Sequence, residues 1–225
     1  IKLLDWRAIM SSEGEEWKEF LSVNGNIFIR TLCLILVMSF FKTSAATIDP
    51  LTGAANILLI EFITLSAYGI DGFAFAAESL CGKYFGKGIR SHFKRSIVIS
   101  FQWGLFISAA FSLIFFLFGK EILKALTDKE NVIEAALPFL PWLVIAPLIN
   151  GIAFIWDGIY VGTTASKAMR DTLLASSILV YLPGFFLFKP LLGNHGIWLA
   201  LSLFMLSRGL IQSFLAKTAI LNRIK

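Results

Sequence analysis

The chain has 225 residues, of which 57% are hydrophobic and 22 are phenylalanine. This apolar share exceeds the roughly 45–50% of soluble domains, so the composition excludes an ordinary soluble domain and indicates an integral membrane protein. The formal net charge of +5 is better explained by basic cytoplasmic loops than by nucleic-acid binding. Cys33 and Cys81 lie in apolar segments without metal-ligand spacing, and we interpret them as core residues.

Residues 1–25 precede the first apolar segment and are predicted to form an amphipathic linker on the inner membrane surface. A solvated connector is the alternative. Apolar residues alternate there with charges at helical spacing: Leu3, Leu4, Trp6, Ile9 and Met10. Ser12 and Glu15 fit a capping box, which predicts that a second short helix starts at Ser12. The chain begins with Ile1 and shows no signal-peptide pattern, so we interpret it as a piece of a longer polypeptide or a processed chain.

Six apolar segments are each long enough to cross a bilayer, which needs about 20 helical residues. They run over residues 26–47, 52–83, 94–119, 131–163, 168–189 and 196–218. The connections are short, so consecutive helices are predicted to be antiparallel neighbours. The sequence therefore predicts an all-α, polytopic membrane domain over residues 26–225.

Basic residues indicate the orientation of these segments. One side collects most of them: Lys2, Arg7, Lys18, Lys83, Lys87, Arg90, Lys94, Arg95, Lys167, Arg170, Lys217, Arg223 and Lys225. The other side has few: Lys120, Lys124, Lys129 and Lys189, with Lys42 close by. Because basic residues concentrate in cytoplasmic loops, both termini are predicted to be cytoplasmic. The charged stretch from Lys120 to Glu134 is predicted to form a short helix on the outer surface.

The second apolar segment carries three carboxylates at membrane depth, Glu61, Asp71 and Glu78. Carboxylates at this depth usually pair, face a water-filled cavity or handle ions. At about 1.5 Å per helical residue, Lys42 of the first segment lies level with Glu61, and Arg30 lies level with Glu78. Both are predicted ion pairs, which serve either to pin two helices together or, for Glu61 above all, to couple ion movement to transport.

Asp71 lies near the centre of its segment, between two glycines. An acid in such an apolar setting can exchange protons near neutral pH, which makes Asp71 a candidate ion-coupling residue. Tyr68 and Phe75 share its helix face and are candidates for the wall of a substrate cavity. The alternative is a structural ion pair, for which Arg208 in the sixth segment is the candidate partner.

A second buried acid, Asp157, lies in the fourth segment between Trp156 and Tyr160. Asn150 lies seven residues earlier on the same helix face. A carboxylate surrounded by aromatic rings suits a lipophilic cation, so these four residues are candidates for coupling and substrate contact. Ordinary core packing is the alternative for the aromatic residues.

Several stretches together resemble the multidrug and toxic compound extrusion (MATE) family, in its DinF-type branch. The long match is the second segment, from Leu59 through Glu78 and on to Gly86. Supporting stretches are residues 26–32 (NIFIRTL), 44–46 (SAA), 54–56 (AAN) and 156–163 (WDGIYVGT). The resemblance runs from about residue 21 to the end of the chain.

This resemblance implies a twelve-helix transporter of two six-helix lobes, of which this chain is the second, preceded by the inter-lobe linker. It implies a multi-pass protein of a bacterial inner membrane that exports cationic or amphiphilic small molecules against inward H⁺ or Na⁺ flow. It implies no other cofactor, and its partners are membrane lipid, the N-terminal lobe and the substrates. Asp157 matches an acid that couples cations in other branches. Their partner acid is missing from residues 34–38 (LILVM), which argues against a complete sodium site in this half. For the DinF-type branch the resemblance also implies the alternative that the coupling acid lies on helix one, in the other lobe.

Other functions stay open at this stage. A flippase for lipids or lipid-linked oligosaccharides of the same superfamily would favour a cavity rich in basic groups. An intramembrane aspartyl protease using Asp71 and Asp157 lacks the sequence patterns around both acids. His92 and His195 have no metal-ligand spacing, which argues against a metalloenzyme. A structural membrane subunit would not need so many buried charges.

Overall fold

The structure, a computed structural model, describes residues 6–224, with side chains from residue 17 on apart from Glu19. Within this range the regular elements are all helical: α1 (Trp6–Ala46), α2 (Pro50–Gly86), α3 (Arg90–Leu126), α4 (Glu130–Ala136), η1 (Leu137–Phe139), α5 (Leu140–Gly162), α6 (Ser166–Ala175), η2 (Ser176–Tyr181), α7 (Leu182–Leu192), α8 (Asn194–Ala219) and η3 (Leu221–Arg223). Six stretches of helix are long and apolar enough to cross a membrane. The predicted all-α membrane fold is confirmed.

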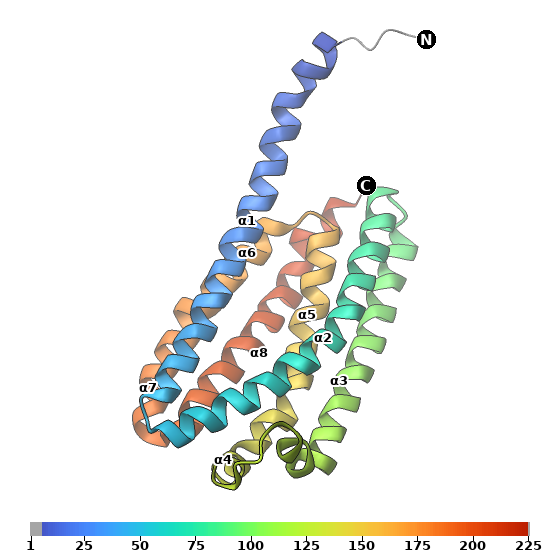
Figure 1. Cartoon of the computed structure of the whole chain (residues 1–225). Helices are drawn as coiled ribbons and strands as arrows, with labels where there is room; N and C mark the ends of the chain where they lie inside the picture. Colours follow the sequence, from blue (N-terminus) through green and yellow to red (C-terminus); the bar gives the residue numbers. More distant parts are fainter. Residues whose placement is uncertain (1–5, 225) are drawn as a thin grey trace.

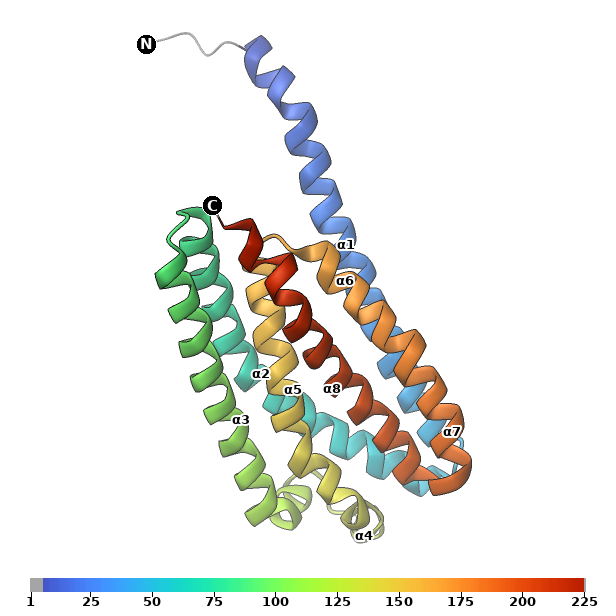
Figure 2. The same cartoon turned by 180° about the vertical axis from the view of Figure 1, so that it is seen from behind.

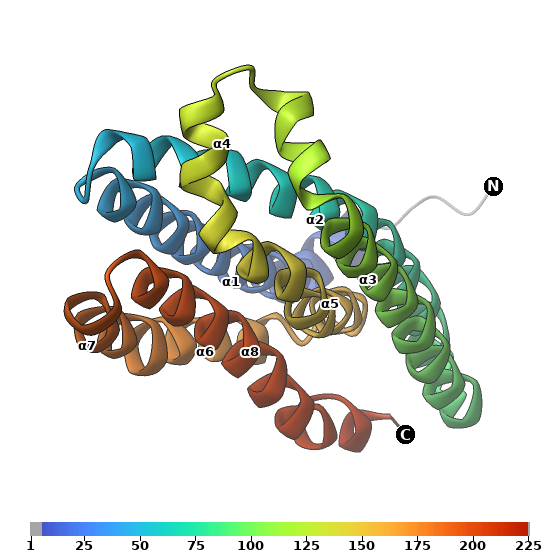
Figure 3. The ribbon, with the colours of Figure 1, turned by 90° about the horizontal axis from the view of Figure 1, so that it is seen from below.

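The helices form one bundle with α5 and α8 in the middle (Figure 1). On one side α2 and α3 pack against each other and against α5, and on the other α1 packs against α6, while α7 packs against α8. Figures 2 and 3 show the same arrangement from behind and from below. α1 and α2 meet at their short connection and diverge toward their other ends (Figure 1). The chain therefore brings four helices, α1, α2, α5 and α8, around one region.

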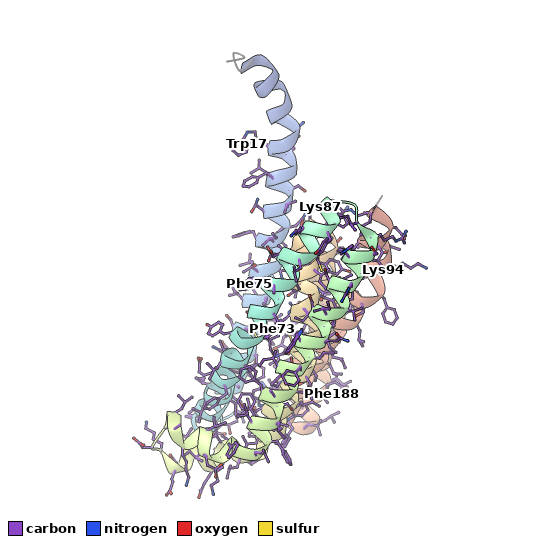
Figure 4. The ribbon with its side chains drawn as sticks, turned by 90° about the vertical axis from the view of Figure 1, so that its right-hand side faces the viewer. Trp17, Phe73, Phe75, Lys87, Lys94 and Phe188 are labelled. Atoms are coloured by element: carbon purple, nitrogen blue, oxygen red, sulfur yellow. The ribbon has the colours of Figure 1, made fainter. Side chains whose placement is uncertain are left out.

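The first helix is continuous from Trp6 to Ala46, so the prediction that a second helix starts at Ser12 is wrong. No residue in this stretch is a proline, and Ser12 is accommodated inside the helix. The N-terminal part of α1 projects beyond the bundle, and Trp17 lies on this extension (Figure 4). Its exposed ring packs edge-to-face on Phe20, with ring centroids 5.8 Å apart. The predicted contribution of Leu3 and Leu4 lies outside the described residues.

The third helix extends further than predicted. It continues through Leu126, with one non-helical residue at Phe118, so residues 120–126 belong to α3 and only residues 130–136 form the separate short helix. The sequence from Lys120 to Leu126 contains good helix formers and no proline, which explains why the helix resumes after the kink. Prolines occur in or next to the later irregular elements: Pro138 lies in η1, and the π-helical η2 ends at Tyr181, two residues before Pro183.

The start of α2 is fixed by its cap. The Asp49 carboxylate accepts hydrogen bonds from the backbone N–H groups of Leu51 and Thr52, at 2.8 and 2.9 Å, and Pro50 occupies the first helical turn. Hydrogen bonding from Thr52, with a smaller contribution from Leu51, lowers the pKa of the Asp49 carboxyl. The cap is therefore ionised at neutral pH, where it suits the positive end of the helix dipole.

Glycines let α2 and α5 approach closely. A Cβ atom at Gly158 would collide with the backbone of Ala74, and one at Gly162 with the backbone of Glu78. The same holds for Gly82, where a Cβ atom would lie 2.8 Å from the carbonyl oxygen of Gly162. Small residues spaced by four are the usual means of close packing between membrane helices. This contact fixes the depth of α5 relative to α2.

We predict that Gly158→Ala destabilises the full-length protein by about 1–3 kcal/mol, because one helix backbone must move away from the other. Thermal unfolding in detergent measures the effect. Gly86→Ala is the matched control, since no atom lies within 4 Å of the position that its Cβ atom would occupy. Equal stability of the two variants would contradict the close contact.

Candidate functional site

Asp157 of α5 is the centre of a buried charge cluster. Its Oδ2 atom forms ion pairs with Nη2 of Arg30 from α1 and with Nη2 of Arg208 from α8. Its Oδ1 atom accepts a hydrogen bond from Nε2 of Gln212, one turn after Arg208, at 2.7 Å. The Arg208 side chain is only 1% exposed. Three helices are thus joined through one carboxylate.

Two sequence-based pairings are wrong. Arg30 was predicted to pair with Glu78 and Arg208 with Asp71, but both arginines pair with Asp157. Among the described residues Glu78 forms no salt bridge within 4.0 Å. Counting depth along a helix gives the level of a side chain but not its direction around the axis, and this explains both errors.

The third pairing is confirmed. Nζ of Lys42 lies 3.9 Å from Oε1 of Glu61, and the two side chains are 43% and 55% exposed. An ion pair with side chains this exposed contributes little to stability where it is in contact with water. It lies toward the α1–α2 connection, away from the buried cluster, so Glu61 and Asp157 belong to different parts of the molecule.

Asp71 of α2 is half-buried beside the cluster and has no ion-pair partner among the described side chains. Gly158, the residue after Asp157, touches the α2 backbone at Ala74, less than one turn from Asp71. This contact places Asp71 at the same level of the bundle as Asp157 and its two arginines. The cluster therefore contains two cations and two carboxylates, and its net charge is zero only when Asp71 is ionised.

The cluster also contains unpaired polar atoms. Nε of Arg30, Nε of Arg208 and Oε1 of Gln212 are buried without a hydrogen-bond partner among the described residues. Such atoms are uncommon in folded proteins and each raises the energy of this arrangement. A network with unused donors can rearrange toward another acceptor more easily than a saturated one.

Trp156 and Tyr160 lie in the packed core rather than on a cavity wall. Trp156 donates a hydrogen bond from Nε1 to Oγ of Ser213 at 2.6 Å. The Tyr160 hydroxyl donates to the backbone carbonyl of Gln212 at 2.8 Å. Both side chains thereby hold α8 against α5, and Tyr160 fixes the backbone of the residue that binds Asp157.

An apolar cavity of about 150 Å³ lies between the same four helices. Each helix supplies side chains to its wall, including Met38 from α1, Ile63 from α2, Phe154 from α5 and Met205 from α8. Asn150, a predicted cavity residue, does line it. A mainly apolar space with a few polar groups is typical of a site for a small amphiphilic molecule.

The cavity and the charge cluster share two side chains. The Phe154 ring lies 5.9 Å from the guanidinium carbon of Arg208, and Sδ of Met205 lies 3.6 Å from Nη1 of Arg208. Both Phe154 and Met205 line the cavity. The Arg208 guanidinium thus lies directly behind one wall of the cavity.

Tyr68 and Phe75 are 70% and 68% exposed, so they lie on the outside of this bundle rather than in its cavity. Figure 4 shows Phe75 on the surface of α2. Their predicted role as cavity residues requires a further element that faces this surface.

Sequence reasoning missed Gln212, Phe154 and Met205. Gln212 follows Arg208 by four residues, so helical spacing from a recognised charge could have identified it. Phe154 and Met205 each lie three residues before a cluster residue. In a chain with 22 phenylalanines, however, an aromatic residue at helical spacing gives no distinct signal.

Comparison with known proteins gives a consistent set of relatives. The family model MatE matches residues 26–186. DNA damage-inducible protein F of Escherichia coli (strain K12) is 29% identical over 194 residues, covering 86% of this chain and 42% of that protein. Protein DETOXIFICATION 44, chloroplastic, of Arabidopsis thaliana is 24% identical over 194 residues, covering 84% of this chain and 36% of that protein. The chain spans less than half the length of these relatives.

Solved structures of similar fold are transporters. The Vibrio cholerae MATE transporter VcmN in its bent form matches with a TM-score of 0.77 at 17% identity, over 90% of this chain and 46% of that one. A mutant of VcmN matches with a TM-score of 0.78 at 16% identity, over 96% of this chain and 50% of that one. At this identity the likeness shows a shared fold, and the fold corresponds to about half of the solved chain.

We predict that Asp157→Asn destabilises the full-length protein by about 3–5 kcal/mol, because two buried guanidinium groups lose their counter-charge. Thermal unfolding in detergent measures the loss. The double variant Asp157→Asn with Arg208→Met should recover part of this stability, since it removes the buried charge as well. A double variant that is less stable than Asp157→Asn alone would contradict the cluster.

Proposed function

Since the chain belongs to the MatE family, we propose that it is one half of a secondary active transporter that exports cationic or amphiphilic small molecules in exchange for H⁺ or Na⁺. The N-terminal six-helix lobe is the partner that completes it, and membrane lipid surrounds both. The relationship to a bacterial DinF protein and the six membrane-spanning helices support a multi-pass protein of the inner membrane.

One observation carries this proposal: the apolar cavity and the buried charges lie on the same four helices, with Arg208 between them. A transporter that exchanges an amphiphile for an ion needs both kinds of site in energetic contact. Membrane carboxylates that face polar surroundings commonly handle the ion.

Within the cluster, we assign the coupling role to Asp71. Both oxygens of Asp157 already bind protein groups, so this acid acts by holding Arg30 and Arg208. Glu61 lies outside the cluster, where it pairs with Lys42 toward the α1–α2 connection. Asp71 has no ion-pair partner among the described side chains, which leaves its carboxylate available to a proton or a sodium ion.

The substrate part of the proposal rests on the cavity. Its wall includes Trp142, Phe154 and two methionines, which adapt to differently shaped apolar groups. The flippase alternative expects basic groups around the substrate, and Arg and Lys are missing from the described residues that line this cavity. The wall composition therefore favours an apolar body over a phosphate head group.

We infer the orientation of the bundle in the membrane from the positions of its basic residues. Lys87 and Lys94 lie at the end of the bundle where α2 meets α3 (Figure 4). Arg170 lies in α6, soon after its start, and Arg223 of η3 donates a hydrogen bond to the Thr163 carbonyl in the α5–α6 connection. Because basic residues favour the cytoplasmic side, we place this end, with the C-terminal residues, in the cytoplasm. The Lys42–Glu61 pair then lies toward the outer side.

We predict that Asp71→Asn abolishes ion-driven efflux of a fluorescent amphiphile from proteoliposomes containing the full-length transporter, because an amide cannot exchange a proton or neutralise a cation. Asp128→Asn, at an exposed position between α3 and α4, is the matched control and should transport normally. Thermal unfolding checks that Asp71→Asn is folded. Full efflux by this folded variant would overturn the coupling role of Asp71.

A further inference from the structure

We propose that Arg30 is the positioning residue that transmits the charge state of Asp71 to α1, by exchanging its ion pair between Asp157 and Asp71. This inference rests on the coupling role proposed above for Asp71. It adds a mechanism by which an ion bound to Asp71 on α2 changes the helix with which α1 forms an ion pair.

The first argument is the distribution of partners. Arg30 and Arg208 bind the same oxygen of Asp157, while the other oxygen binds Gln212. One guanidinium is sufficient to neutralise one carboxylate, so one of the two arginines is a surplus cation whenever Asp71 is protonated or bound to a cation. When Asp71 is ionised, each arginine has a carboxylate of its own.

The second argument identifies Arg30 as the one that moves. Arg208 is 1% exposed, and Phe154 and Met205 hold its guanidinium. The Arg30 side chain is 19% exposed, and its buried Nε atom has no partner among the described residues. Nε of Arg208 also lacks a partner, so exposure and packing distinguish the two arginines, and the one with looser surroundings is Arg30 on α1.

The third argument is the absence of competing charges near Asp71 within the described spans. Arg30 is the one ionisable residue of α1 between Phe20 and Phe41 apart from Cys33, and Asp157 is the one charged residue of α5. In α8, Arg208 alone is charged between His195 and Lys217. α3, on the other side of α2, has no charged residue between Arg95 and Lys120. The charges that face Asp71 from its neighbours are therefore Arg30, Asp157 and Arg208.

The exchange has a defined mechanical consequence. With Arg30 on Asp157, α1 is tied to α5, and with Arg30 on Asp71, α1 is tied to α2. α1 and α2 move apart with distance from their connection (Figure 1). The pairing of Arg30 with Asp71 therefore draws together two helices that otherwise separate. Loading Asp71 with a proton or cation releases them. A conformational step of this kind is what ion-driven transport requires.

The test is the pH profile of efflux by the full-length transporter in proteoliposomes. Arg30→Gln should move the pH of half-maximal efflux upward by about one pH unit, because the cation that favours ionised Asp71 is gone. Arg30→Lys should restore the midpoint, since the charge is retained. Arg95→Gln, which removes an exposed guanidinium from α3, is the matched control and should leave the profile unchanged. A folded Arg30→Gln variant with the wild-type midpoint would overturn the inference, whatever its maximal rate.

A second measurement uses the wild-type protein and does not depend on the folding of a variant. Solid-state NMR should detect a dipolar contact between the Asp71 carboxyl carbon and an arginine guanidinium at alkaline pH, and its loss in acid. The signal is assigned by its disappearance in Asp71→Asn. A contact that is absent at both pH values contradicts the exchange.

The two proposals fail in different ways. Retained efflux in Asp71→Asn removes the coupling role of Asp71 and the exchange with it. Lost efflux in Asp71→Asn, together with an unshifted profile in Arg30→Gln and no carboxyl–guanidinium contact, removes the exchange alone.

Discussion

The bundle depends on one carboxylate held between two guanidinium groups. Asp157 joins α5 to α1 through Arg30 and to α8 through Arg208, at a depth where unpaired charges are strongly disfavoured. The glycine contacts of α5 with α2 bring the fourth helix to the same place, because Gly158 directly follows Asp157. Packing and electrostatics therefore converge on a single turn of α5.

This convergence explains how substrate and ion can influence each other within one half of a transporter. The cavity wall and the charge cluster share Phe154 and Met205, which contact Arg208 from the cavity side. A ligand that displaces either side chain changes the surroundings of Arg208 and, through Asp157, those of Arg30. Asp71 lies beside this group of charges on α2, next to the contact between Gly158 and Ala74. No long pathway is needed, because the two sites are adjacent.

Much of the fold could be predicted from the sequence, because long apolar segments have one stable solution in a membrane. The six spans, the family and the Lys42–Glu61 pair were all predictable. The partners of Arg30 and Arg208 were not, since they depend on rotation of each helix about its axis. The continuation of α1 through Ser12 shows the same limit, because a capping box marks a helix start only where the preceding residues are not already helical. The exposed positions of Tyr68 and Phe75 follow from the direction in which α2 faces, which spacing alone does not give.

The most direct test of this linkage is the affinity of the full-length transporter for a fluorescent amphiphile, measured in detergent across the pH range by fluorescence anisotropy. If Asp71 and the cavity are coupled, the affinity of the wild-type protein changes about tenfold between its acid and alkaline limits, which is a typical coupling between two sites. In folded Asp71→Asn the affinity should not vary with pH. A variant that keeps the wild-type pH dependence would show that Asp71 and the cavity are independent.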